Sequence, residues 1–229
     1  MENTEANGGK LKILAIHGYR QNAEKFVEQT EPLRRLVNKW ADFVYIRAPH
    51  KVFLVDNPDN LNLGEKSDEE QYGWFFNRDN RTNRGIRNGG PAIGYEETIR
   101  IIEEVFQKAG PFDGVLGFSQ GACLTGLLCD LQHRGLLEAK FNFAIIISGF
   151  KSKALPHLKY YSEIINLPSM HVIGDNDRII PRDMSDALSE CFEDALIVRH
   201  TGGHIVPVSS DQKEHYENFV KTQYSFKNV

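Results

Sequence analysis

The sequence predicts an α/β fold with a mostly parallel central sheet flanked by helices. Short apolar segments alternate with segments of helical spacing along the 229 residues, as in strands joined by crossover helices. Phe141 to Ile147 is a continuous apolar run, as expected of a strand that helices cover on both faces. Gly117-Phe118-Ser119-Gln120-Gly121 stands where a short apolar strand turns into a helix, which is the setting of a nucleophile elbow.

The first part of the chain starts with polar residues, which we expect to form a disordered tail at residues 1–9. One domain is expected over residues 10–229, because this length suits a single large α/β domain. Its first strand is expected at Leu11 to Ile16. A helix is expected from about Ala23 to Lys39, and Pro32 either interrupts it or restarts it near its own N-terminus.

Strands and helices continue to alternate in the rest of the chain. Tyr95 to Ala109 has helical spacing, and Gly110-Pro111 ends that helix. Each expected strand is followed by a polar loop, and parallel sheets place ligands at the carboxyl ends of their strands. The remaining expected strands are Phe43 to Arg47, Phe112 to Leu116, Phe141 to Ile147, Met170 to Ile173 and Leu196 to Val198, with helices at Ala122 to Leu131 and about Asp183 to Phe192.

The composition excludes several classes of function. The formal net charge is −4 and no basic run with interleaved aromatics occurs, so we expect no nucleic acid partner and no general attraction to an anionic membrane. No apolar stretch approaches the roughly 20 residues of a membrane span, and the polar start lacks the apolar segment of a signal peptide. We therefore expect a soluble protein of the cytoplasm, or also of the nucleus.

The three cysteines, Cys123, Cys129 and Cys191, are an odd number without C-x-x-C spacing. This count and spacing argue against a disulfide framework and against a zinc site. We expect buried core thiols.

Ser119 is the candidate nucleophile. A serine on so sharp a turn must adopt a strained backbone, and Gly117 and Gly121 remove Cβ atoms that would collide there. Serine at its ordinary pKa is a poor nucleophile, so it needs a base, normally a histidine held by a carboxylate.

The strongest candidate for that base is His204. It ends the segment Thr201-Gly202-Gly203-His204, a glycine-rich loop after the last expected strand, from which the imidazole can reach the elbow. His200 is interpreted as a strand-end histidine. His17 is interpreted as a residue that shapes its His-Gly turn rather than one that transfers protons.

The orienting carboxylate is expected in the loop from Gly174 to Pro181, which offers two aspartates after a strand. Asp177 is the better candidate, because the Ile-Pro that follows would anchor an inward-pointing carboxylate. Asp175 is interpreted as a turn residue that bonds to its own backbone. Asp113 lies too near the start of the elbow strand.

Two backbone N–H groups are candidates for an oxyanion hole. Acyl transfer places negative charge on a substrate oxygen, and an elbow enzyme supplies one donor from the residue after the serine, here Gln120. The second donor comes from the loop after an early strand, and Tyr19, which follows His17-Gly18, is the candidate. The alternative is that His17-Gly18 forms a plain strand-end turn.

Residues 50–91 are expected to form an irregular insertion rich in Asn, Asp, Arg and Gly, and long loops of this kind are usually functional or disordered. The insertion holds three adjacent aromatics, Trp74, Phe75 and Phe76. We expect these side chains to help line an acyl pocket. The alternative is that they pin the loop to the core.

Several motifs together resemble the FSH family of serine hydrolases, and they extend from near Leu11 to near Phe219. The resemblance implies an α/β-hydrolase fold, a triad of Ser119, Asp177 and His204, and hydrolysis of carboxylic esters without cofactor or metal. It also implies medium or long acyl or alkyl chains in a small-molecule ester substrate. The motifs are His17-Gly18-Tyr19-Arg20-Gln21-Asn22, Gly73-Trp74-Phe75, Gly110-Pro111-Phe112-Asp113-Gly114, Gly117-Phe118-Ser119-Gln120-Gly121-Ala122, Ile147-Ser148-Gly149-Phe150 and Gly202-Gly203-His204-Ile205-Val206-Pro207.

Two other functions remain open from the sequence. An acyl-thioesterase would use the same triad and differ in the leaving-group side of its pocket. A ligand receptor with the hydrolase fold would retain the elbow but would have only vestigial turnover.

Overall fold

The computed structural model describes residues 9–52, 70–78 and 89–228. The expected disordered tail therefore lies outside the described residues, apart from Gly9. Residues 53–69 and 79–88 of the expected insertion also lie outside them.

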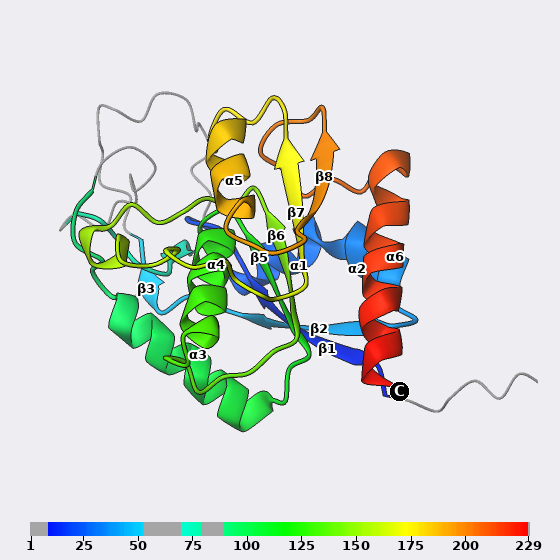
Figure 1. Ribbon diagram of the computed structural model, residues 1–229, viewed down its shortest axis with the longest axis horizontal. Coiled ribbons are helices and arrows are strands. Elements are labelled where there is room, and N and C mark those ends of the chain that lie inside the picture. The colour runs from blue at the N-terminus through cyan, green and yellow to red at the C-terminus, as the bar shows by residue number, and fades with distance from the viewer. Residues whose placement is uncertain (1–8, 53–69, 79–88, 229) are drawn as a thin grey trace, which may run out of the picture.

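The centre of the molecule is a six-stranded sheet in the order β2-β1-β5-β6-β7-β8 (Figure 1). All five neighbouring pairs are parallel, which confirms the predicted sheet type. The strands are β1 (Leu11–Ile16), β2 (Ala41–Ile46), β5 (Gly114–Phe118), β6 (Phe143–Ile147), β7 (Ser169–Gly174) and β8 (Leu196–His200).

The strand order reverses between β1 and β5. From β1 the chain moves outward to β2, and from β5 it moves the other way through β6, β7 and β8. A parallel sheet opens a crevice at such a point, because the connections on either side of it run to opposite faces. The loops after β1 and β5 therefore meet at one place on the carboxyl edge of the sheet.

Helices cover both faces of the sheet. One face packs against α3 (Tyr95–Ala109), α4 (Gln120–His133) and α5 (Arg182–Ser189). The other packs against α1 (Ala23–Gln29), α2 (Glu31–Val37) and α6 (Ser210–Lys227).

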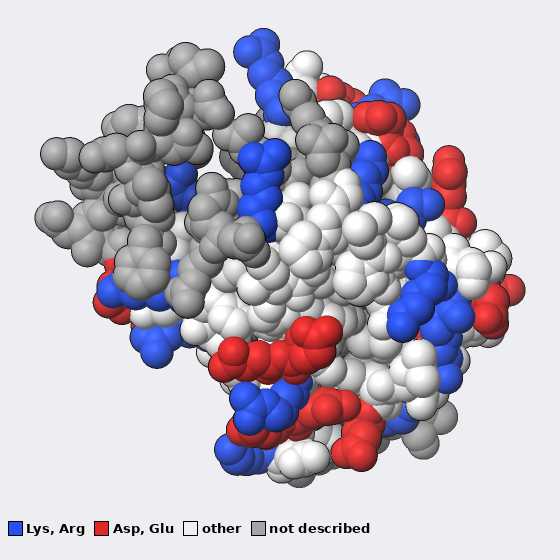
Figure 2. Space-filling view, turned by 90° about the vertical axis from the view of Figure 1, so that its left-hand side faces the viewer, with Lys and Arg blue, Asp and Glu red and all other residues white. Residues whose placement is uncertain are grey.

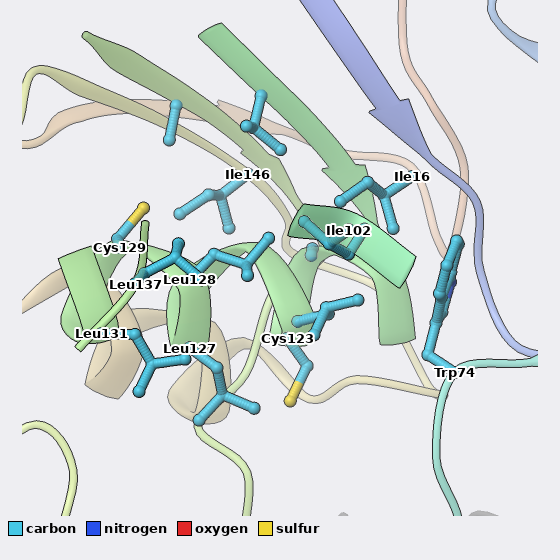
Figure 3. Close-up of a cluster of buried hydrophobic side chains, with 14 of the residues drawn as sticks. Ile16, Trp74, Ile102, Cys123, Leu127, Leu128, Cys129, Leu131, Leu137 and Ile146 are labelled. Atoms are coloured by element: carbon cyan, nitrogen blue, oxygen red, sulfur yellow. The ribbon is translucent and has the colours of Figure 1, made fainter. Parts of the chain in front are cut away.

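Strand side chains alternate between these two faces with the period of two that a strand requires. Leu14 and Ile16 of β1 pack on the α4 side, whereas Ile13 packs on the α6 side. Figure 3 shows the first cluster, in which Leu128 of α4 lies near Ile146 of β6. Because both faces are covered, the strands read as continuous apolar runs in the sequence.

The structure shifts some expected boundaries. The expected helix from Ala23 to Lys39 is two helices that meet at Thr30, and Pro32 lies in the first turn of the second. The elbow strand β5 ends at Phe118, two residues later than expected, and α4 follows from Gln120 with Ser119 as the only residue between them.

Helix α6 was not expected from the sequence. Its buried positions include Gln212 and Gln223 besides Tyr216, Phe219 and Val220, so its apolar stripe is short and interrupted by amides. The helix is nevertheless held, since Tyr216 and Val220 are fully buried against the sheet.

The described part of the insertion is ordered by a second, small sheet. β3 (His50–Lys51) pairs antiparallel with β4 (Tyr72–Gly73). Tyr72 also exchanges backbone hydrogen bonds with the loop after β1, donating to Gln21 O and accepting from Arg20 N, both at 2.9 Å. The aromatic segment that follows β4 is thereby fixed beside the carboxyl edge of β1.

The three cysteines are free and buried, as expected. Burial raises the pKa of the Cys123 and Cys129 thiols, so both stay protonated at neutral pH. No helix in the described ranges has the length and apolar character needed to cross a bilayer.

Candidate active site

Ser119 occupies the turn between β5 and α4 with φ 55° and ψ −116°. This conformation is costly for a residue with a Cβ and is the strained elbow that the sequence predicted. The flanking glycines are required by close approach. A Cβ on Gly117 would lie 2.4 Å from Gly121 O, and one on Gly121 would lie 2.2 Å from Ile16 O.

A hydrogen-bonded chain links the three residues that the sequence predicted. His204 Nε2 lies 2.9 Å from Ser119 Oγ, and His204 Nδ1 lies 2.7 Å from Asp177 Oδ2. The carboxylate accepts at Nδ1, so the neutral imidazole carries its proton there and Nε2 is free to accept from the serine hydroxyl. This is the tautomer that a general base acting on Ser119 needs.

Asp177 is oriented by the loop after β7. Its Oδ1 accepts hydrogen bonds from the backbone N–H groups of Ile179 and Ile180, both at 2.8 Å, which leaves Oδ2 for His204. Burial alone would raise the pKa of this carboxyl, but the bonds from His204 and from the two N–H groups outweigh it and lower the pKa below its usual value. Asp177 is therefore ionised at neutral pH.

The imidazole of His204 is also held from its face. The ring of Phe118, the residue before the elbow serine, lies 4.8 Å from the His204 ring between centroids. In the loop that carries His204, the Gly203 carbonyl accepts from Ile205 N at 3.0 Å. Phe118 was not singled out in the sequence, because an aromatic residue at the end of a strand is not by itself informative.

The rival histidines have other environments. His200 ends β8, is buried, and accepts from Gly202 N at 3.2 Å, as a strand-end histidine should. His17 Nε2 accepts from Ala48 N at 3.0 Å, so its Nδ1 carries the proton and donates to Gly18 O at 2.7 Å. Burial lowers the pKa of His17 to about 4, so it shapes the loop as a neutral ring.

The rival aspartates also lie away from His204. The sequence suggested that Asp175 bonds to its own backbone, but among the described residues its part-exposed carboxylate pairs with Arg182 and Arg199 instead. Asp113 accepts from Lys12 N and Lys227 Nζ at the start of the elbow strand.

The two candidate oxyanion donors belong to neighbouring segments. Gln120 N is the first N–H of α4, one of the four that have no acceptor within a helix, and it lies at the positive end of the helix dipole. The loop that carries Tyr19 touches the elbow, because a Cβ on Gly18 would lie 3.3 Å from Ser119 Cβ. Gln21 Oε1 fixes that loop by accepting from Gly18 N at 2.8 Å.

The aromatic residues Trp74, Phe75 and Phe76 are buried. The indole Nε1 of Trp74 donates to His17 O at 2.7 Å, and its carbonyl accepts from the Thr98 hydroxyl. These contacts agree with the alternative interpretation from the sequence, in which the aromatic side chains pin their loop to the core. Lining of an acyl pocket by the same side chains stays a prediction.

The side chain of Gln120 was missed by sequence reasoning, which considered only its backbone. Its Oε1 accepts from Trp74 N at 3.0 Å, and its Nε2 donates to Phe75 O at 2.7 Å. The sequence signal is a polar amide directly after the nucleophile, at the start of a helix expected to pack on the sheet, because such a group must find partners once it is buried. Within the described ranges, no three His, Cys, Asp or Glu side chains gather as metal ligands.

A parallel sheet with a strained serine at its crossover point, in line with a histidine and an aspartate, is the architecture of an α/β-hydrolase. The chain belongs to the FSH1 serine hydrolase family, whose model matches residues 6–216. The resemblance noted in the sequence is thus confirmed.

Relatives in this family are named as esterases. An Anopheles gambiae esterase is 45% identical over 214 residues, covering 93% of this chain and 78% of that protein. The esterase OVCA2 of Danio rerio is 40% identical over 220 residues, covering 92% and 96%. The human esterase OVCA2 is 32% identical over 218 residues, covering 92% and 95%.

Solved structures agree in fold. Acyl-protein thioesterase 2 of Zea mays gives a TM-score of 0.66 at 15% identity and covers 95% of each chain. Esterase PE8 gives 0.61 at 20% identity, covering 95% of this chain and 94% of that chain. These likenesses confirm the predicted fold and carry no conclusion about substrate.

Proposed function

We propose that this serine hydrolase cleaves carboxylic esters through an acyl-enzyme on Ser119. The observation that carries the proposal is the hydrogen-bonded chain from Ser119 through His204 to Asp177, built on a strained elbow. The esterase names of relatives up to 45% identical support the ester as substrate.

In the first half-reaction, Ser119 Oγ attacks the ester carbonyl while its proton passes to His204 Nε2. Asp177 stabilises the resulting imidazolium, and the N–H groups of Gln120 and Tyr19 bind the oxyanion. His204 then gives the proton to the departing alcohol oxygen, which leaves the acyl group on Ser119. In the second half-reaction water takes the place of the alcohol and releases the acid.

The acyl or alkyl chain is proposed to be medium to long. Ile179 lies two residues after Asp177 and is 51% exposed, and Ile205 lies directly after His204 and is 49% exposed. Exposed aliphatic side chains close in sequence to two of the reacting groups favour an apolar substrate chain, since each CH₂ that leaves water gains about 0.8 kcal/mol.

The test is labelling with a fluorophosphonate probe, followed by steady-state rates on esters and thioesters graded by acyl length. Ser119→Ala should remain folded, lose labelling, and lower ester turnover by about 10³-fold or more. Labelling retained by Ser119→Ala would refute the nucleophile. Faster cleavage of thioesters than of oxygen esters of the same chain would identify a thioesterase, and a single burst followed by almost no turnover would identify a receptor.

A further inference from the structure

The segment from Lys151 to Lys159, which follows β6, has an inverted pattern of burial. Its leucines face solvent, since Leu155 is 63% exposed and Leu158 is 64% exposed. Its histidine and serine face inward instead, since His157 is 1% exposed and Ser152 is 6% exposed. A short segment normally buries its apolar side chains and exposes its polar ones, so this inversion requires an explanation.

The inversion is built into a fixed piece of backbone. Residues Leu155–His157 form a 3₁₀ helix, and Leu155 N donates to Gly90 O at 2.7 Å. Beneath it, Ser152 Oγ lies 2.7 Å from His157 Nδ1, and the His157 ring lies 4.2 Å from the Tyr95 ring between centroids. Because His157 is locked inward, the leucines on either side of it must point outward.

The charges within this segment have one sign. Lys151, Lys153 and Lys159 lie within the segment, and it contains no acidic residue. Lys153 and Lys159 are exposed, and the structure gives neither an ion pair among the described residues. The rest of the molecule must therefore be acidic, since the whole chain carries −4.

The segment lies on the left-hand side of the molecule in Figure 1, and Figure 2 views that side. Figure 2 shows a broad surface without charged side chains, with Lys and Arg side chains on its upper part and Asp and Glu side chains along its lower border. The segment follows β6 directly, so it leaves the same carboxyl edge of the sheet that carries Ser119 and His204.

We propose that Leu155 and Leu158, flanked by Lys153 and Lys159, dock this protein on an anionic lipid bilayer. Exposed aliphatic side chains enter the boundary between headgroups and acyl chains, and neighbouring lysines bind anionic headgroups. The acidic remainder of the molecule is repelled by the same membrane, so the protein binds in one orientation, with the carboxyl edge of the sheet near the lipid. The net charge of −4 therefore opposes attraction of the protein as a whole to an anionic membrane, but it does not oppose attraction of this one positively charged segment.

The proposal does not depend on the proposed esterase activity, and the experiment uses the full chain carrying Ser119→Ala so that no lipid is hydrolysed. Co-sedimentation is measured with vesicles of phosphatidylcholine alone and with 30% phosphatidylserine. At low salt the protein should bind the vesicles with phosphatidylserine at least about 10-fold more tightly than those of phosphatidylcholine alone. Added NaCl should weaken this binding.

Two surface variants test the two parts of the surface. Leu155→Ser with Leu158→Ser should lower binding to anionic vesicles by about 10-fold or more, because both apolar anchors are lost. Lys153→Glu with Lys159→Glu should abolish the preference for phosphatidylserine, since each lysine near the surface contributes about 5-fold. All four side chains are exposed, so the thermal unfolding temperature should not change.

Matched controls lie at the opposite edge of the sheet. Leu136→Ser replaces a leucine that is 62% exposed beyond the far end of α4, and should leave binding unchanged. Lys39→Glu with Lys140→Glu makes the same change in net charge at exposed positions just before β2 and β6, and should also leave it unchanged.

Three results would overturn the proposal. One is no preference for anionic vesicles in the Ser119→Ala protein, and another is an equal loss of binding in the control variants. The third is a change from dimer to monomer in the leucine variant with vesicle binding unaltered, which would make the surface a self-association interface instead.

Discussion

The backbone N–H of Trp74 donates to the side-chain Oε1 of Gln120 at 3.0 Å. The same amide donates from Nε2 to Phe75 O, and the Trp74 indole donates to His17 O. One aromatic segment is thus tied at once to the elbow and to the loop after β1. These are the two segments whose N–H groups are proposed to bind the oxyanion, so the spacing between those donors depends on this connection.

Gln120→Glu should lower kcat about 10- to 100-fold with little change in KM. The carboxylate keeps an acceptor for Trp74 N, but it loses the donor to Phe75 O and repels that carbonyl, so the donors move out of place in the transition state. Steady-state kinetics on a short ester measure this effect.

Gln132→Glu is the matched control for that variant. Near the other end of the same helix, Gln132 makes the same pair of bonds, accepting from Phe141 N and donating to Phe141 O, both at 2.9 Å. It should lower the unfolding temperature while kcat stays near the parent value. Equal losses of kcat in both variants would make Gln120 merely structural.

The choice of base is tested by replacing each of two histidines by alanine, His200 at the end of β8 and His204 in the loop that follows. His204→Ala should lower turnover about 10³-fold or more, because His204 is the one group among the described residues that is placed to take the proton from Ser119. His200→Ala should cost little turnover, since its ring accepts a bond from Gly202 N and makes no contact with Ser119 among the hydrogen bonds of the described residues. The reverse order of effects would identify His200 as the base.

Asp177→Asn should lower turnover strongly, by about 10²- to 10⁴-fold, while Asp175→Asn should be mild. An amide at position 177 favours the wrong tautomer of His204 and cannot stabilise its positive charge. Asp175 pairs with Arg182 and Arg199 in part-exposed ion pairs, which contribute little. Measured kcat/KM values that fell equally in both variants would show that the loop supports His204 as a whole.

Much of this arrangement follows from the sequence because it depends on local patterns. The five residues from Gly117 to Gly121 are enough to predict the elbow. Asp177 and His204 follow expected strands, and a parallel sheet brings the loops after its strands to one edge. Helix α6 was missed since its packing depends on the partner surface more than on its own pattern. The hydrogen bonds of the Gln120 amide were also missed, because they join residues 45 and 46 positions apart.

Trp74→Phe separates the two interpretations of the aromatic segment. The change keeps most of the ring volume but removes the Nε1 donor, and leaves His17 O without that partner. If the segment only pins the loop, the free energy of unfolding should fall by about 1–3 kcal/mol while the dependence of kcat/KM on acyl length is kept. If Trp74 also lines the acyl pocket, that dependence should flatten as well. A chain-length series with denaturant unfolding measures both.

Buried histidines should make the fold sensitive to acid. Burial lowers the pKa of His171 to about 3, and those of His17 and His157 to about 4. The unfolded chain takes up these protons below its ordinary histidine pKa of about 6.5, so stability is complete above that pH and is lost as the pH falls toward 4. Each histidine contributes a slope of about 1.4 kcal/mol per pH unit in this range. His171→Gln should lower the slope of unfolding free energy against pH by that amount. An unchanged slope in this variant would contradict the argument.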